Sequence, residues 1–185
     1  FRQISFTSLK KLAKAGCSGQ GLKVALLGDT ATQFLATAIK GEGVVRGYNI
    51  DLFEAEFSQV ERQIMDPTSD FHNFGAQYSI IFQSTHKLLE KYSLMGSADW
   101  AGLADERLVF IRTVCEMVNG RIICFNYPEI DDTVFGSYAN KVPGSFIFQL
   151  RKLNLGLMEL AREFPDLFIC DIASLQNKFG RDWMF

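Results

Sequence analysis

Short apolar runs alternate with longer, more polar segments along most of the chain. Five of the runs have the length of buried strands: residues 23–27, 48–55, 78–82, 121–125 and 166–170. In the segments between them, apolar residues recur every three or four positions, which is typical of helices with one buried face. Strands that alternate with helices form parallel sheets. The pattern therefore predicts an α/β fold of the three-layer α/β/α type, with about five parallel strands and right-handed crossovers.

Polar and glycine positions predict where the helices begin and end. Helices are expected over residues 1–15, 30–38, 57–65, 103–119, 145–164 and 174–179, and residues 88–92 belong to a helix or a turn after the third strand. Gly41, Gly43 and Gly47 mark residues 40–48 as a connector, because glycine interrupts regular structure. Asn154 falls on the apolar stripe of the helix over residues 145–164, so we expect it to have a buried hydrogen-bond partner.

The stretch over residues 22–38 organises the predicted sheet. Its apolar run ends at Gly28, and Asp29 and Thr30 follow in the turn before a helix. The expected apolar stripe of that helix is Phe34, Leu35 and Ala38. Asp29 or Thr30 is predicted to cap the helix by accepting an N–H of its first turn. Open α/β sheets bind ligands at the carboxyl ends of their strands, so the same residues are also candidate ligand contacts.

The predicted strand order extends this candidate site. A flavodoxin-like order places the first and third strands side by side. Asp29 and Thr30 would then face the residues that follow the third strand across one crevice. The predicted ligand-binding residues are Asp29, Thr30, Gln83, Ser84 and Asn126, with Thr85 and Asp171 on the same edge.

The Gly28-Asp29-Thr30 turn resembles the first motif of the SGNH hydrolases, Gly-Asp-Ser, in which the serine is the nucleophile. Candidate catalytic residues are therefore Thr30 or Ser84 as nucleophile and His86 as base, since a hydroxyl needs a base to become nucleophilic. The other SGNH motifs are altered. Residues 82–85 replace the oxyanion motif Gly-x-Asn-Asp, and Phe185 stands at the histidine of the Asp-x-x-His motif. The sequence predicts the shape of a hydrolase site without its complete machinery.

Composition and charge narrow the function further. The chain has 185 residues, 48% of them hydrophobic and 22% charged, which is a normal globular balance. A net charge of −2 gives no electrostatic argument for nucleic acid or an anionic membrane as a partner. No apolar run approaches the roughly 20 residues that span a bilayer. The first residues lack the pattern of a signal peptide, and we expect a cytoplasmic protein.

The sequence predicts no metal site in this chain. None of the four cysteines forms a CxxC pair, and the two histidines are far from them. Cys124 and Cys170 lie in strand-like runs and are expected to be small core residues. The Asp131-Asp132 pair is interpreted as a solvated loop rather than a cation site.

A wider resemblance covers the chain from Gly21 onward. It is carried, in order, by residues 24–33, 51–56, 82–85, 126–129, 150–154 and 180–185. These segments resemble the N-terminal region of FkbH-like proteins. The resemblance implies an SGNH-like domain over residues 21–185, after an N-terminal helix and linker over residues 1–20. It also implies a following phosphatase-like domain of the haloacid dehalogenase (HAD) superfamily, which would hold the catalytic aspartates and Mg²⁺. We therefore expect the chain to be part of a longer protein.

The family resemblance also implies a chemistry for the whole protein. FkbH-like proteins are linked to dephosphorylating a phosphorylated three-carbon acid and loading the glyceryl unit onto an acyl carrier protein; others are described only as phosphatases or as methoxymalonate-type biosynthesis proteins. We expect this chain to be a substrate- or carrier-binding and docking module without a cofactor of its own. Its expected partners are the HAD-like domain, an acyl carrier protein or the phosphorylated acid. Two alternatives remain open: an active SGNH-type esterase or acyltransferase, and a purely structural domain.

Overall fold

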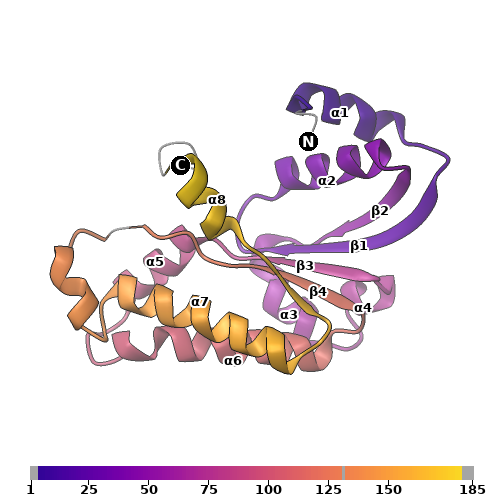
Figure 1. The fold of residues 1–185 in the computed structure, drawn as a ribbon. Helices are drawn as coiled ribbons and strands as arrows, with labels where there is room; N and C mark the ends of the chain where they lie inside the picture. The colour runs from indigo at the N-terminus through magenta and orange to yellow at the C-terminus, as the bar shows by residue number, and fades with distance from the viewer. Residues whose placement is uncertain (1–3, 131, 181–185) are drawn as a thin grey trace. The chain divides into compact units, whose positions relative to one another are not determined.

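A computed structural model describes residues 4–130 and 132–180, and it confirms the predicted α/β fold. Asp131 and the segment over residues 181–185, with its altered Asp-x-x-His motif, lie outside the described residues. Five parallel strands form one sheet in the order β2-β1-β3-β4-β5 (Figure 1). The first and third strands are neighbours, as the flavodoxin-like order predicts. No helix in the described part of the chain is both long and apolar enough to cross a membrane.

The chain forms two compact units, which we describe separately. Unit 1 comprises Phe1–Ile81 and Val118–Arg121, and unit 2 comprises Phe82–Met117 and Ile122–Phe185. The elements up to the third strand are α1 (Phe6–Ala15), β1 (Gln20–Gly28), α2 (Gln33–Val45), β2 (Tyr48–Glu54), a 3₁₀ turn η1 (Phe57–Gln59), α3 (Val60–Met65), α4 (Asp70–Phe74) and β3 (Tyr78–Phe82). The later elements are α5 (Thr85–Leu94), η2 (Trp100–Gly102), α6 (Leu103–Met117), β4 (Arg121–Phe125), η3 (Gly136–Lys141), α7 (Phe146–Glu163), β5 (Leu167–Cys170) and α8 (Ile172–Phe179).

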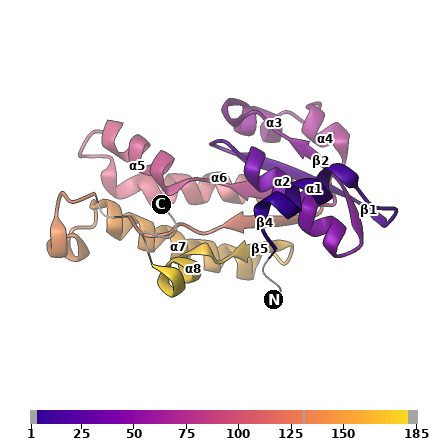
Figure 2. The ribbon, with the colours of Figure 1, turned by 90° about the horizontal axis from the view of Figure 1, so that it is seen from above.

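The core of unit 1 is built on strand β1. Its residues from Val24 to Leu27 are buried, as the apolar run predicts, and the strand pairs with β2 in parallel register from Gln20↔Tyr48 to Leu26↔Glu54. Helices α1 and α2 lie side by side, as Figures 1 and 2 show from two directions. This register brings the carboxyl ends of β1 and β2 together.

The predicted connector over residues 40–48 is wrong, because α2 continues through two of its glycines to Val45. A Cβ at Gly41 would lie 2.5 Å from the backbone oxygen of Leu9, and a Cβ at Gly43 would lie 2.5 Å from Ile50 Cδ1. These glycines let α1 and β2 approach α2 closely. The predicted buried stripe of α2 is also wrong at Phe34, whose side chain is 76% exposed.

The core of unit 2 is formed mainly by α7 and the elements around it. Helices α6 and α7 pack along each other, and Leu150, Leu153 and Leu157 of α7 are buried. Ser145 caps α7 by accepting a hydrogen bond from the backbone N–H of Phe148. Strands β4 and β5 are parallel, with Ile122 opposite Leu167 and Phe125 opposite Cys170. The loop that follows β4 therefore starts beside the end of β5.

Candidate functional site

The turn after β1 differs from its predicted geometry. Helix α2 begins at Gln33 and its N-cap is Thr32, so the prediction that Asp29 or Thr30 caps the helix is wrong. Those two residues precede the position from which a short side chain reaches the first helical N–H groups. The Thr32 hydroxyl donates to Oε1 of Glu54 at the end of β2, and it makes no capping bond. Asp29 and Thr30 are half-buried in the bend between β1 and α2.

A pocket of about 330 Å³ opens at the carboxyl ends of β1 and β2. Its lining residues all belong to unit 1: Thr30, Ala31, Thr32, Gln33, Glu54, Ala55, Glu56 and Ser58. Three hydroxyls, two carboxylates and one amide therefore surround it. The volume is at the low end of the range of about 300–1,000 Å³ that is usual for small-molecule sites, so the pocket suits a small polar group.

The lining gives Thr30 no histidine partner. Histidine and basic side chains are absent from the described residues that line the pocket. His72 belongs to α4, and its Nε2 lies 2.9 Å from the backbone oxygen of Ile64. A threonine hydroxyl without a base is a weak nucleophile, but it can donate and accept hydrogen bonds.

Ser84 and His86 lie together at the start of α5. Ser84 is the N-cap residue, and its Oγ accepts a hydrogen bond from the backbone N–H of His86 at 3.2 Å. His86 is the second residue of the helix, and its side chain is exposed. This bond runs to the His86 backbone and is that of a helix cap.

Gln83 fixes the loop that follows β4. Its side chain is only 7% exposed, and its Oε1 accepts a hydrogen bond from the Tyr127 hydroxyl at 2.7 Å. Thr85, two residues later at the start of α5, donates to the backbone oxygen of Pro128. Asn154 of α7 pairs with the backbone of Tyr127 in both directions: its Oδ1 accepts from the N–H at 2.9 Å and its Nδ2 donates to the carbonyl at 2.8 Å. The prediction of a partner for Asn154 is confirmed.

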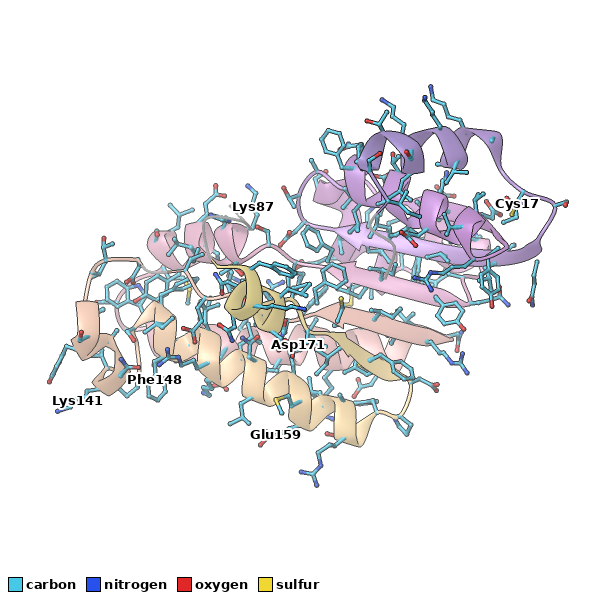
Figure 3. All side chains as sticks on the ribbon, turned by 45° about the horizontal axis from the view of Figure 1, so that its top comes forward. Cys17, Lys87, Lys141, Phe148, Glu159 and Asp171 are labelled. Carbon is cyan, nitrogen blue, oxygen red and sulfur yellow. The ribbon has the colours of Figure 1, made fainter. Side chains whose placement is uncertain are left out.

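Asn126 and Asp171 join the ends of β4 and β5. Asn126 Nδ2 donates to Asp171 Oδ1 at 2.7 Å, and its Oδ1 accepts from the backbone N–H of Ala173. Asp171, which Figure 3 labels, caps α8. Its carboxylate also accepts from the hydroxyl and the N–H of Ser174. The Ser174 hydroxyl, the Asn126 amide and the Ser174 N–H hold the pKa of Asp171 below its usual value.

A second reciprocal pair holds the same loop. Gln176 of α8 accepts from the backbone N–H of Glu129 at 2.9 Å and donates to its carbonyl at 2.8 Å. Arg151 of α7 makes two hydrogen bonds with the Glu129 carboxylate. Residues 126–129 are therefore held by bonds from Gln83, α5, α7 and α8, and Gln83 and Asn126 are parts of this network.

The comparisons with known proteins agree with this architecture. A family model described as "FkbH, N-terminal domain" matches residues 23–185. This chain belongs to the FkbH N-terminal domain family. A search of curated proteins finds no match. A solved structure, the N-terminal part of the protein BF1531 from Bacteroides fragilis, is 58% identical, with a TM-score of 0.96 over 99% of this chain.

That solved chain contains a phosphatase domain and was crystallised with Mg, according to its description. The match covers 49% of its length, so this FkbH N-terminal domain spans about half of that chain. The family predicted from the sequence is confirmed, and so is its association with a phosphatase domain in a similar protein.

Sequence reasoning missed five polar residues that line the pocket of this FkbH domain: Thr32, Gln33, Glu54, Glu56 and Ser58. The signal was available for the glutamates, because Glu54 ends the second strand, Glu56 follows it, and a flavodoxin-like order places that strand beside the first. The predicted crevice from Asp29 and Thr30 to Gln83 and Ser84 involves both units, and it stays a prediction.

The cysteines and acidic residues in the described part of the FkbH domain were compared with the pattern of metal ligands. Within residues 4–130 and 132–180, no group of three or more histidine, cysteine or acidic side chains could hold a metal ion. Cys124 is 2% exposed, whereas Cys170 is only half-buried. Burial raises the pKa of Cys115 to about 11, so its thiol is protonated at neutral pH. Asp132 Oδ1 accepts from the N–H of Val134, a local bond of the loop.

Proposed function

We propose that this domain is an SGNH-like binding and docking module of an FkbH-type phosphatase, and that it lacks hydrolase activity of its own. The observation that carries the proposal is the pocket at the ends of β1 and β2, where Thr30 is surrounded by polar groups. A domain that only positions a neighbour would need no such pocket. This favours a binding role over a purely structural one.

The non-catalytic role is supported by the positions of the candidate catalytic residues. Thr30 lies among hydroxyls and carboxylates in its pocket, and Ser84 serves as a helix cap. Hydrolases of this chemistry depend on a base that takes the proton of the nucleophile and on donors for the oxyanion. Hydrogen bonding to a ligand requires neither.

The residues that line the pocket also favour one candidate ligand over the other. Glu54 and Glu56 place two carboxylates around the pocket. A free phosphorylated three-carbon acid would bring like charge to them, and phosphate sites usually supply arginine or lysine. An uncharged glyceryl group, attached as a thioester to an acyl carrier protein, avoids this repulsion and offers hydroxyls to Thr30 and Glu54. We therefore place the carrier-bound glyceryl group ahead of the free phosphorylated acid.

Within the whole protein, we assign a different role to each of the two domains. The HAD-like phosphatase domain, with its Mg²⁺, removes the phosphate, and the FkbH N-terminal domain holds the glyceryl unit or its carrier. Support comes from the similar Bacteroides protein, whose chain combines a domain of this fold with a phosphatase domain.

Calorimetric titration tests the binding role. The probes are the uncharged thioester of glyceric acid with pantetheine and, separately, phosphoglycerate. We expect the thioester to bind, with its affinity reduced about tenfold in Thr30→Val, which corresponds to a lost hydrogen bond of about 1.4 kcal/mol. Thr113→Val on α6, whose hydroxyl bonds to the Val109 backbone, is the matched control and should bind normally. Equal losses in both variants, or no binding of the thioester, would overturn the proposal.

An ester assay tests the absence of catalysis. We expect the chain to leave a small activated ester such as p-nitrophenyl acetate unhydrolysed above the buffer rate. Turnover that disappears in Thr30→Ala, Ser84→Ala or His86→Ala would instead establish an esterase.

A further inference from the structure

Helix α1 carries an unusual local charge. The chain as a whole has 21 acidic and 19 basic residues, yet residues 6–15 contain three lysines and no acid. Lys10, Lys11 and Lys14 are all exposed. The helix therefore presents a basic surface on a protein whose net charge is slightly negative.

Aromatic side chains border these lysines. Phe6, Lys10 and Lys14 are spaced four residues apart and so lie along one face of α1. Phe6 is 40% exposed and packs edge-to-face against Phe34 of α2, with ring centroids 5.5 Å apart. The two rings and the three lysines form what we call the α1 basic–aromatic surface.

The opposite face of α1 is already occupied. Leu9 is buried, and its backbone lies so close to Gly41 that α2 tolerates no Cβ there. A basic helix that binds a bilayer needs a free apolar face to insert between the lipids. Because the apolar face of α1 packs on α2, the exposed features that remain are lysine charges and one aromatic pair, which suit a protein partner better.

We infer that the α1 basic–aromatic surface docks an acidic protein, one that presents carboxylates to Lys10, Lys11 and Lys14 around an apolar side chain that contacts Phe6 and Phe34. Exposed ion pairs contribute only about 0.2–1 kcal/mol each, and they are screened by salt. The aromatic pair supplies the apolar anchor, since aromatic residues dominate binding energy in protein interfaces. Docking should therefore need both the charge and the rings.

The probe is a purified acyl carrier protein in its apo form, without the prosthetic arm, titrated into the chain at low and at 0.5 M salt. Its choice rests on the proposed function, but without the arm it tests the surface and not the pocket. The titration with the pantetheine thioester tests the pocket alone, so failure of one proposal is distinguishable from failure of the other.

Charge reversal gives the decisive variants. We expect Lys10→Glu, Lys11→Glu and Lys14→Glu together to weaken binding at least tenfold, and Phe34→Ala to weaken it about fivefold. The control combines Lys87→Glu, Lys141→Glu and Lys178→Glu, three exposed lysines of unit 2, two of which Figure 3 labels. It makes the same change in net charge and should alter the affinity less than about twofold. Circular dichroism melting checks that each variant is folded.

Three results would overturn the inference: no binding of the carrier protein by the unaltered chain, equal weakening by both triple variants, or binding that persists unchanged at 0.5 M salt. A parallel titration uses phosphatidylglycerol vesicles. Binding of these vesicles that is lost with the α1 lysines would assign the surface to a membrane and also overturn it.

Discussion

The polar side chains at the carboxyl ends of β1 and β2 in unit 1 are arranged differently from those at the ends of β4 and β5 in unit 2. Both sets of strand ends are places where open α/β sheets bind ligands, and both carry polar side chains. In unit 2, Asn126 and its neighbours bond to one another and to the backbone. In unit 1, Thr30 and Glu54 surround an open pocket. Polar residues at a strand end thus either hydrogen-bond to one another, as a structural lock, or line an open pocket.

The types of side chain explain the difference. Asn154 and Gln176 each have a donor and an acceptor, so one amide satisfies both groups of a backbone unit. Two such reciprocal pairs close the loop over residues 126–129. Carboxylates only accept, and the Thr32 hydroxyl donates only one hydrogen bond to Glu54. Carboxylate oxygens around the pocket can therefore accept bonds from a ligand.

Asn154→Ala should have the largest effect on stability. It removes two part-buried hydrogen bonds to the Tyr127 backbone, so we expect a loss of about 2–3 kcal/mol in the free energy of unfolding. Urea denaturation measures it. The control Asn177→Ala, at an exposed position of α8, should change stability by less than about 0.5 kcal/mol. A loss in Asn154→Ala as small as the control's would show that the bonds from Asn154 do not stabilise the loop over residues 126–129.

Removing the bond between Tyr127 and Gln83 should have an intermediate effect. Tyr127→Phe leaves the buried Gln83 oxygen without that donor, and the expected loss is about 1–2 kcal/mol. A double-mutant cycle with Gln83→Leu isolates the pair, with an expected coupling of about 1 kcal/mol. Additive losses would mean that the two side chains act independently.

Asp171→Asn should have a small effect that depends on pH. The pKa of Asp171 is lowered in the folded state, so its carboxylate stabilises the fold above the unfolded pKa of about 3.9, and the contribution is lost as the pH falls through the folded pKa. Because the side chain is exposed, we expect less than about 1 kcal/mol at pH 7. Urea titrations of both proteins should converge as the pH falls below about 3.9. A constant difference across this range would contradict the ionic role.

Substitutions in the pocket should have the smallest effect on stability. Thr30→Val and Glu56→Gln remove groups that line an open pocket. We therefore expect the free energy of unfolding to change by no more than about 0.5 kcal/mol. Thermal unfolding followed by calorimetry measures this. A loss comparable with that of Asn154→Ala would make the pocket residues part of the structural lock.

Much of the fold could be predicted from local patterns. Strands β3 and β4 begin and end where the apolar runs over residues 78–82 and 121–125 indicate. The predicted connector at Gly41 and Gly43 is wrong, because the sequence alone cannot distinguish a glycine that breaks a helix from one that lets another backbone approach. The contact with Leu9 that decides it comes from an element 32 residues away.

The candidate site was less predictable for the same physical reason. Gln83 and Asn126 have the residue types of ligand contacts, but their partners lie 44 and 45 residues away in sequence. Only the folded chain brings Tyr127 and Asp171 to them. Thr30 follows the end of β1, as predicted from the sequence, and its role in binding stays a prediction.

The most direct test of the account is a ¹H–¹⁵N NMR titration of the chain with the glyceryl thioester of pantetheine. We predict saturable shifts for the amides of Thr30, Thr32, Glu54 and Ser58, and no comparable shifts with phosphoglycerate. Shifts centred on Gln83, Ser84 and Asn126, or none in either region, would contradict the assignment of the binding site to the ends of β1 and β2.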